Sequence, residues 1–284
     1  MSKFYEELNE LFNYDPGNRG LPGKIPPADL AGIREELRAA TKVLIVTGFP
    51  ILPSGVGETD GPTGAVNIAR ALILSGKDCA LVTDSATFDI LKATAVAFGL
   101  NCPVYNVPLD GADGYCKNML ERFAPSHIIA IERPGKIAGN YRNMRGMIID
   151  EFVADTDCLF DYFSGVTIAI GDGGNELGMG SLKQYAGSPN DWADKPSDYP
   201  MVAGISNWWG WGIGALISLE LGKNILPTLE EEELILVAAV KVGAIDGVSK
   251  KQEVTVDGVS LEDNLEFLQK IHNLLNKELK NNGL

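Results

Sequence analysis

The sequence has little histidine and little cysteine for a chain of 284 residues. The only two histidines, His127 and His272, stand in a strand-like run and a helix-like run, where structural roles are common. This scarcity argues against a histidine-based catalytic triad and against a zinc site with several histidines. Acid–base chemistry must therefore come mainly from Asp, Glu, Lys or Tyr. The four cysteines are scattered without a CxxC motif, which fits a reducing cytoplasm.

Positive charge is scarce as well. The chain has 24 Lys and Arg against 38 Asp and Glu, so its formal net charge is −14. A nucleic-acid backbone needs clustered cations, so nucleic acid is not expected as a partner. No apolar run approaches the length of a membrane span, and the first residues show neither a signal-peptide pattern nor Arg-rich transit character. We expect a cytoplasmic protein that acts on a small molecule, makes no membrane contact and could form a homo-oligomer.

The motifs of common nucleotide sites are missing. No segment has the Lys-Ser/Thr pair of a Walker loop, and none has the GxGxxG spacing of a dinucleotide site. No nucleotide cofactor is therefore expected. A nucleotide- or phosphate-binding α/β enzyme remains an alternative, because glycine-rich loops after strands also cradle phosphates.

Strand-like apolar runs alternate with helix-like segments along the chain, which predicts an α/β fold. We expect one domain over residues 1–284, with a mostly parallel, doubly wound sheet flanked by helices. A small C-terminal hairpin with an Asp-Gly turn, over residues 247–259, and a final helix should follow the sheet. Residues 13–27 are predicted to be a surface crossover and residues 183–200 a polar loop or lid. The strand-like runs are residues 42–47, 78–84, 101–107, 126–132, 166–170 and 201–206.

The most informative stretch follows the apolar run at residues 166–170. Asp172, Asn175 and Glu176 stand among glycines that include Gly173 and Gly174, at the carboxyl end of this strand and near the predicted start of a helix. Glycines let the backbone turn tightly and approach a bound molecule. Open parallel sheets bind ligands at this edge. A plain strand–helix connection is the alternative, against which two carboxylates and an amide in five residues argue.

Two more polar segments are predicted to follow strands. After residues 42–47, the chain carries Glu58 and then Asp60 just before a helix, where Asp60 is either an N-cap or a functional carboxylate. The start of that helix would also suit an anionic ligand. After residues 126–132, Glu132 and Arg133 reach the same edge, followed by a cationic segment over residues 139–146. Its arginines could balance surface carboxylates or bind a substrate carboxylate.

Four separated motifs lie in the segments after the predicted strands: Glu58-Thr-Asp-Gly-Pro-Thr-Gly-Ala, Ile131-Glu-Arg-Pro-Gly-Lys, Gly139-Asn-Tyr-Arg-Asn-Met and Gly171-Asp-Gly-Gly-Asn-Glu-Leu-Gly-Met-Gly. Together they resemble the D-glutamate cyclase family, over roughly residues 40–250. The resemblance implies conversion of D-glutamate to 5-oxo-D-proline with loss of water, which would make the protein a lyase. A non-enzymatic sensor of a small amino acid is a further alternative for the same pocket.

The implied reaction needs a base for the substrate ammonium and an acid, cation or metal at the γ-carboxylate. Asp172 and Glu176 are the predicted acid–base pair, with Glu58 as a third catalytic candidate, because neighbouring carboxylates shift each other's pKa. A cluster of oxygen ligands could instead bind Mg²⁺ or Mn²⁺. The predicted substrate-binding residues are Asp60, Glu132, Arg133, Asn140, Arg142, Gly173, Gly174 and Asn175.

Overall fold

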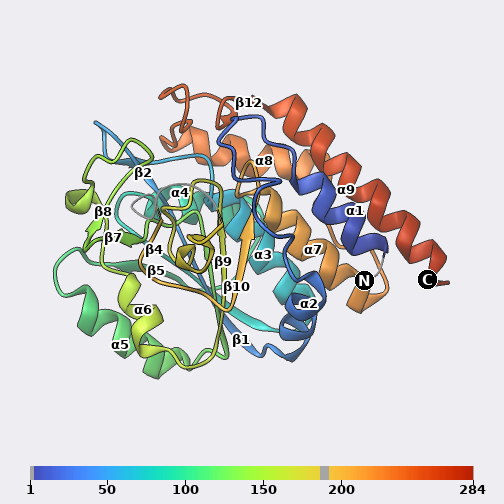
Figure 1. Cartoon of the computed structure of the whole chain (residues 1–284), viewed down its shortest axis with the longest axis horizontal. Coiled ribbons are helices and arrows are strands. Elements are labelled where there is room, and N and C mark those ends of the chain that lie inside the picture. The colour runs from blue at the N-terminus through green and yellow to red at the C-terminus, as the bar shows by residue number, and fades with distance from the viewer. Residues whose placement is uncertain (1–2, 186–191, 284) are drawn as a thin grey trace.

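A six-stranded parallel sheet forms the centre of the computed structural model, which describes residues 3–185 and 192–283 (Figure 1). Residues 186–191 of the predicted polar loop lie outside this description. The strands lie side by side in the order β10-β9-β6-β1-β4-β5, and each neighbouring pair is parallel. Their bounds are β1 Lys42–Thr47, β4 Asp78–Asp84, β5 Val104–Val107, β6 His127–Ile131, β9 Val166–Gly171 and β10 Tyr199–Val202.

The strand order confirms the predicted doubly wound arrangement. Numbered along the chain, the six strands of the sheet run 3-2-1-4-5-6 across it, with β1 as the first and β6 as the fourth. The order therefore reverses between β1 and β6. Ligands of doubly wound sheets bind outside the carboxyl ends of the strands at this reversal.

Helices cover both faces of the sheet, as expected for parallel strands. Alternate residues of β1 point to opposite faces. Val43 and Ile45 join the large core with α3, α4 and α7, whereas Leu44 and Val46 join the smaller core with α5 and α6 (Figure 1). The helix bounds are α1 Lys3–Phe12, α2 Leu30–Ala39, α3 Pro62–Leu74, α4 Phe88–Ala97, α5 Ala112–Phe123, α6 Asp157–Tyr162, α7 Trp208–Leu221, α8 Leu229–Lys241 and α9 Leu261–Asn281, with two short 3₁₀ helices at Asp150–Phe152 and Gly180–Leu182.

Three short antiparallel hairpins lie outside the main sheet. The predicted C-terminal hairpin is present, and its turn places Asp257 and Gly258 at φ 52° and 78°, the left-handed region that an Asp-Gly turn supplies. The hairpins are β2 Pro50–Ile51 with β3 Val56–Gly57, β7 Lys136–Ile137 with β8 Asn140–Tyr141, and β11 Thr255–Val256 with β12 Val259–Ser260.

The tryptophans of α7 pack in the core rather than around the cavity described below. Trp208 stacks on Phe267 of α9 with ring centroids 3.9 Å apart, and Trp209 stacks on Phe12 of α1 at 3.7 Å. The start of α7 is thereby fixed against α1 and α9. Within the described residues, no helix is long and apolar enough to cross a membrane.

Candidate active site

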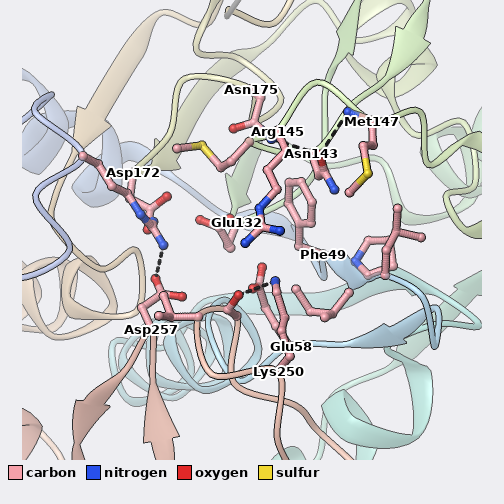
Figure 2. Close-up of a pocket in the computed structure, with 17 residues that line it drawn as sticks. Phe49, Glu58, Glu132, Asn143, Arg145, Met147, Asp172, Asn175, Lys250 and Asp257 are labelled. Atoms are coloured by element: carbon pink, nitrogen blue, oxygen red, sulfur yellow. Dashed lines mark hydrogen bonds and ion pairs between the residues drawn. The ribbon is translucent and has the colours of Figure 1, made fainter.

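A cavity of about 260 Å³ opens at the carboxyl edge of the sheet (Figure 2). Its walls come from the segments that follow β1, β6 and β9, from the loop before β11, from the hairpin turn and from the N-terminal connection. Asp60 and Asp172 lie at the same edge, as predicted, with carboxylate oxygens within 4.8 Å of each other. The cavity thus adjoins the point where the strand order reverses.

Among the described residues, six buried carboxyl groups gather at this cavity, four in its lining and two, Asp60 and Glu176, directly behind it, and we call them the acidic cluster. One oxygen each from Asp60, Asp172 and Asp257 lies within 4.8 Å of the others. Glu132 and Glu176 form a second such trio with Asp172, which is therefore shared by both. The full cluster is Glu58, Asp60, Glu132, Asp172, Glu176 and Asp257.

Asp60 is held by the starts of two helices. Its carboxylate accepts the backbone N–H groups of Gly61, Ser206 and Asn207 at 3.0, 2.9 and 2.8 Å. In return, the Asn207 side-chain oxygen accepts the N–H groups of Gly61 and Gly64, both at 2.8 Å, at the start of α3. The N-cap residue of α3 is Gly61, so the N-cap alternative for Asp60 is wrong. Asp60 instead binds the backbone just before α7 and so fixes the start of α7 against the start of α3.

The glycine-rich stretch after β9 forms a loop instead of a helix start. The Glu176 carboxylate accepts the N–H groups of Gly173 and Gly174 at 2.8 and 2.7 Å. Gly174 has φ 92°, and a Cβ on Gly173 would lie 2.6 Å from the Asn175 side-chain oxygen. Glu176 therefore holds the loop that presents Asp172, and it does not itself line the cavity.

Arg19 lies at the cavity, although residues 13–27 are predicted to be a surface crossover and no role is predicted for Arg19. One guanidinium nitrogen pairs with Asp172 and another with Asp257, the latter at 2.8 Å. The Arg19 side chain is only 16% exposed. Its loop is held locally, since the Asp15 carboxylate accepts the N–H groups of Arg19 and Gly20 at 3.1 and 2.7 Å. Burial alone would lower the pKa of Arg19, but the surrounding carboxylates raise it, so the cation is permanent.

The carboxyl groups of the cluster differ in their tendency to hold a proton. Burial, reinforced by the charges of Asp257 and Asp60, raises the pKa of Glu58 well above its ordinary value. Burial and the charge of Glu176 do the same to the pKa of Glu132, to which the Ser206 hydroxyl donates at 2.6 Å. Burial raises the pKa of Asp60 to about 7. Burial therefore favours the protonated form of these three carboxyl groups, whereas Asp172 and Asp257 pair with the guanidinium of Arg19.

Backbone strain is concentrated at the same cavity. Glu132, Lys250 and Asp257 line it and have φ values of 41°, 61° and 52°. A non-glycine residue in this left-handed region costs on the order of 1–3 kcal/mol and persists where the surroundings enforce it. Such positions gather at functional sites, so the strain supports this cavity as the site.

The structure does not bring Arg133 to the cavity. Its guanidinium is fully buried and donates to Asp84 at 2.6 Å, to the Thr156 hydroxyl at 2.9 Å and to the Ala154 carbonyl at 2.7 Å. Glu132 reverses the backbone with its left-handed φ, so the residue after it turns away from the pocket. Arg133 thus ties β4 to the segment before α6, and a contact with substrate does not fit.

Five other predicted binding residues are also absent from the lining of this cavity: Asp60, Asn140, Arg142, Gly173 and Gly174. Arg142 donates to the Gly146 carbonyl at 2.9 Å and lines a neighbouring cavity of about 290 Å³. Asn140 lies in β8 and contacts the Ala138 carbonyl at 3.5 Å. Asn175 does line the site: its side-chain nitrogen donates to the Arg142 carbonyl at 2.9 Å, and its buried side-chain oxygen has no hydrogen-bond partner among the described residues.

The amide groups that a phosphate would use are already occupied. Glu176 accepts those of Gly173 and Gly174, and Asn207 accepts those at the start of α3. Four carboxyl groups line the cavity, and a carboxylate repels phosphate. This arrangement disfavours the nucleotide- or phosphate-binding alternative. The two carboxylate trios around Asp172 have the oxygen ligands that Mg²⁺ or Mn²⁺ would require, so metal binding stays a prediction.

Comparison with known proteins agrees with the four sequence motifs. Residues 8–272 match the family described as D-glutamate cyclase-like, C-terminal. The chain is 31% identical to the Homo sapiens protein named D-glutamate cyclase, mitochondrial, in an alignment that covers 95% of this chain and 52% of the relative. It thus spans about half the length of the curated relative that it matches. On this match and this identity, the chain belongs to the D-glutamate cyclase-like family.

Proposed function

We propose that this protein converts D-glutamate to 5-oxo-D-proline and water. The observation that carries the proposal is a cavity of about 260 Å³ lined both by Glu58, a carboxyl group with a raised pKa, and by Asp172, a carboxylate paired with Arg19. A cavity of this size admits only a small molecule. Membership of the D-glutamate cyclase-like family supports the same substrate.

The reaction moves protons without changing the net charge. The substrate nitrogen loses two protons and attacks the γ-carboxyl carbon, forming the C–N bond of a five-membered lactam. One γ-oxygen gains two protons and leaves as water, while the α-carboxylate is unchanged. A carboxylate can accept a proton from the nitrogen, and a protonated carboxyl group beside it can donate a proton to the departing oxygen.

Asp172 and Glu58 fit the two roles. Asp172 lines the cavity as a carboxylate paired with Arg19, so we assign it as the base that takes a proton from nitrogen. Glu58 also lines the cavity, and it is buried. Because its pKa is raised, Glu58 holds a proton that it can donate to the departing oxygen. Glu176, which holds the loop amides, is assigned to positioning Asp172 rather than to proton transfer.

A small amino-acid sensor would use the same cavity, and turnover separates it from an enzyme. Purified protein is incubated with racemic glutamate, and each enantiomer and each product is followed by chiral chromatography. The proposal predicts that D-glutamate disappears, that 5-oxo-D-proline appears in equal amount and that L-glutamate remains. A parallel reaction with EDTA, then with added Mg²⁺ or Mn²⁺, reports whether metal is needed. Saturable binding of D-glutamate without product would identify a sensor and contradict the proposal.

We also propose that the protein acts in a reducing compartment, with the cytoplasm as first choice. Its four cysteines, Cys79, Cys102, Cys116 and Cys158, are free thiols. The human relative is named as mitochondrial. Fractionation of the source cells, with detection of the native protein, distinguishes the two locations.

A further inference from the structure

Two cations that line the active-site cavity form no ion pair with any of the described carboxylates. Arg19, Arg145 and Lys250 all line the cavity. Arg19 is already paired with Asp172 and Asp257. Arg145 and Lys250 form no ion pair within residues 3–185 and 192–283, although the cavity is rich in carboxylates.

These two side chains reach into the cavity from opposite walls. Figure 2 shows Arg145 extending from the loop above the cavity toward Glu132, and Lys250 extending from below beside Glu58. The Lys250 ammonium donates to the Gly247 carbonyl. Burial raises the pKa of Glu58, and the positive charge of Lys250 acts in the opposite direction and lowers it. Two like charges that face one cavity repel each other, so an anionic group bound between them would be stabilised by both.

Both cations are presented by backbone that is fixed in advance. Lys250 has the left-handed φ of 61°, which few residues other than glycine adopt. Arg145 lies in a turn whose N–H groups at Arg145 and Met147 donate to the Asn143 side-chain oxygen at 3.0 and 3.1 Å. Fixed donors lose less entropy on binding an anion than mobile ones do.

We propose that Arg145 and Lys250 together bind the α-carboxylate of the substrate, an inference that rests on the proposed function. The α-carboxylate keeps its charge throughout ring closure, whereas the γ-carboxylate must meet a proton donor. The acidic cluster repels both carboxylates and attracts the ammonium. An α-carboxylate at Arg145 and Lys250 therefore leaves the ammonium facing Asp172 and the γ-carboxyl facing Glu58.

This orientation also accounts for a choice between enantiomers. The α-carbon would be held through its carboxylate, its nitrogen and its side chain, each at a different wall of the cavity. Three fixed contacts around one carbon fit one hand of the amino acid only. Arg145 and Lys250 would then select both the α-carboxylate and the handedness.

The test compares ligands that differ only at this carboxylate. Binding of 5-oxo-D-proline and of its uncharged α-amide is measured by ligand-observed NMR, which needs no turnover. The proteins are wild type, Arg145→Met, Lys250→Met and the double variant. Lys251→Met is the matched control, because Lys251 is 70% exposed and pairs with Glu253 outside the cavity.

We expect each cavity variant to weaken binding of 5-oxo-D-proline by about tenfold to a hundredfold, since each removes a charged hydrogen bond. All variants should bind the amide as tightly as the wild type does. Lys251→Met should bind both ligands as tightly as the wild type does. Equal losses for acid and amide, or no loss for the acid, would overturn the inference. Selective loss for the acid in a protein that does not cyclise D-glutamate would uphold the anion site and reject the proposed reaction.

Discussion

At the scale of single residues, the active site depends on how a few charges are balanced. Burial raises the pKa of Glu58 and Glu132, which favours the protonated form of both residues. Asp172 and Asp257 sit beside the guanidinium of Arg19 and act as its counter-ions. An acid and a base are thereby available in one cavity at one pH.

Replacing Arg19 by Met should destabilise the protein in a pH-dependent manner. Removal of one partner from a buried ion pair typically costs about 3–5 kcal/mol, because the other charge is left without compensation. Without Arg19, the pKa of Asp257 rises further, so the loss should be largest at pH 8 and smaller at pH 5.5, where the carboxyl takes up a proton. Urea denaturation at both pH values measures this, with Arg145→Met as the control. An equal loss at both pH values would show that the ion pair does not set the stability.

The residues at the ends of strands could be placed from the sequence, but their partners could not. Glu58, Glu132 and Asp172 each follow an apolar run, and parallel strands bring such ends to one edge. Arg19 and Lys250 come from segments without a neighbouring strand of the main sheet, so no local pattern predicts their position. Contacts between residues so far apart in sequence depend on the packing of the whole chain.

At the scale of elements, three helices meet around one buried carboxyl group. Glu232 of α8 accepts hydrogen bonds from Asn67 of α3 at 2.7 Å and from the Trp211 indole of α7 at 2.9 Å. Burial raises its pKa to about 7. α3 and α7 also begin just after Asp60 and Asn207, which hydrogen-bond to each other's segments, so this junction supports the wall of the cavity.

Glu232→Gln should weaken the dependence of stability on pH. A carboxyl whose folded pKa is raised stabilises the protein fully below the unfolded pKa, and this contribution is lost as pH rises through the folded pKa near 7. The wild type should therefore lose on the order of 3 kcal/mol from this group between about pH 4.5 and pH 8. Glutamine keeps an acceptor for Asn67 and Trp211 but does not titrate. Melting curves of both proteins across this range test the prediction, and parallel pH profiles would contradict it.

Helices and strands were predictable from the periodicity of apolar residues, whereas the path of the loops was not. Residues 171–180 suggest a helix start, but the Glu176 carboxylate takes the amide groups of Gly173 and Gly174 and holds a loop instead. The position of Arg133 after a strand likewise predicts the correct edge of the sheet, but it does not predict the direction in which the side chain points. Glu132 turns the backbone at φ 41°, and Arg133 then pairs with Asp84.

At the scale of the whole molecule, the sheet order explains why the motifs meet. The segments after β1 and β6 lie on the two sides of the strand-order reversal, and β9 is the next strand across. The N-terminal connection with Arg19 and the C-terminal hairpin with Asp257 then complete the cavity (Figure 2). Two expectations stay predictions: that residues 1–284 form one domain, and that the protein forms a homo-oligomer. Light scattering of the purified protein can test the homo-oligomer.

The most direct test of the account is the turnover of D-glutamate by Glu58→Gln, measured beside its melting temperature. This substitution keeps the size of the side chain and removes the proposed acid. We predict a fall in kcat of about 10²–10⁴-fold, the usual contribution of a positioned proton donor, without a lower melting temperature at pH 8. Asp172→Asn should lose activity on the same scale while it remains folded. A folded Glu58→Gln protein that cyclises D-glutamate at a near-normal rate would contradict the account.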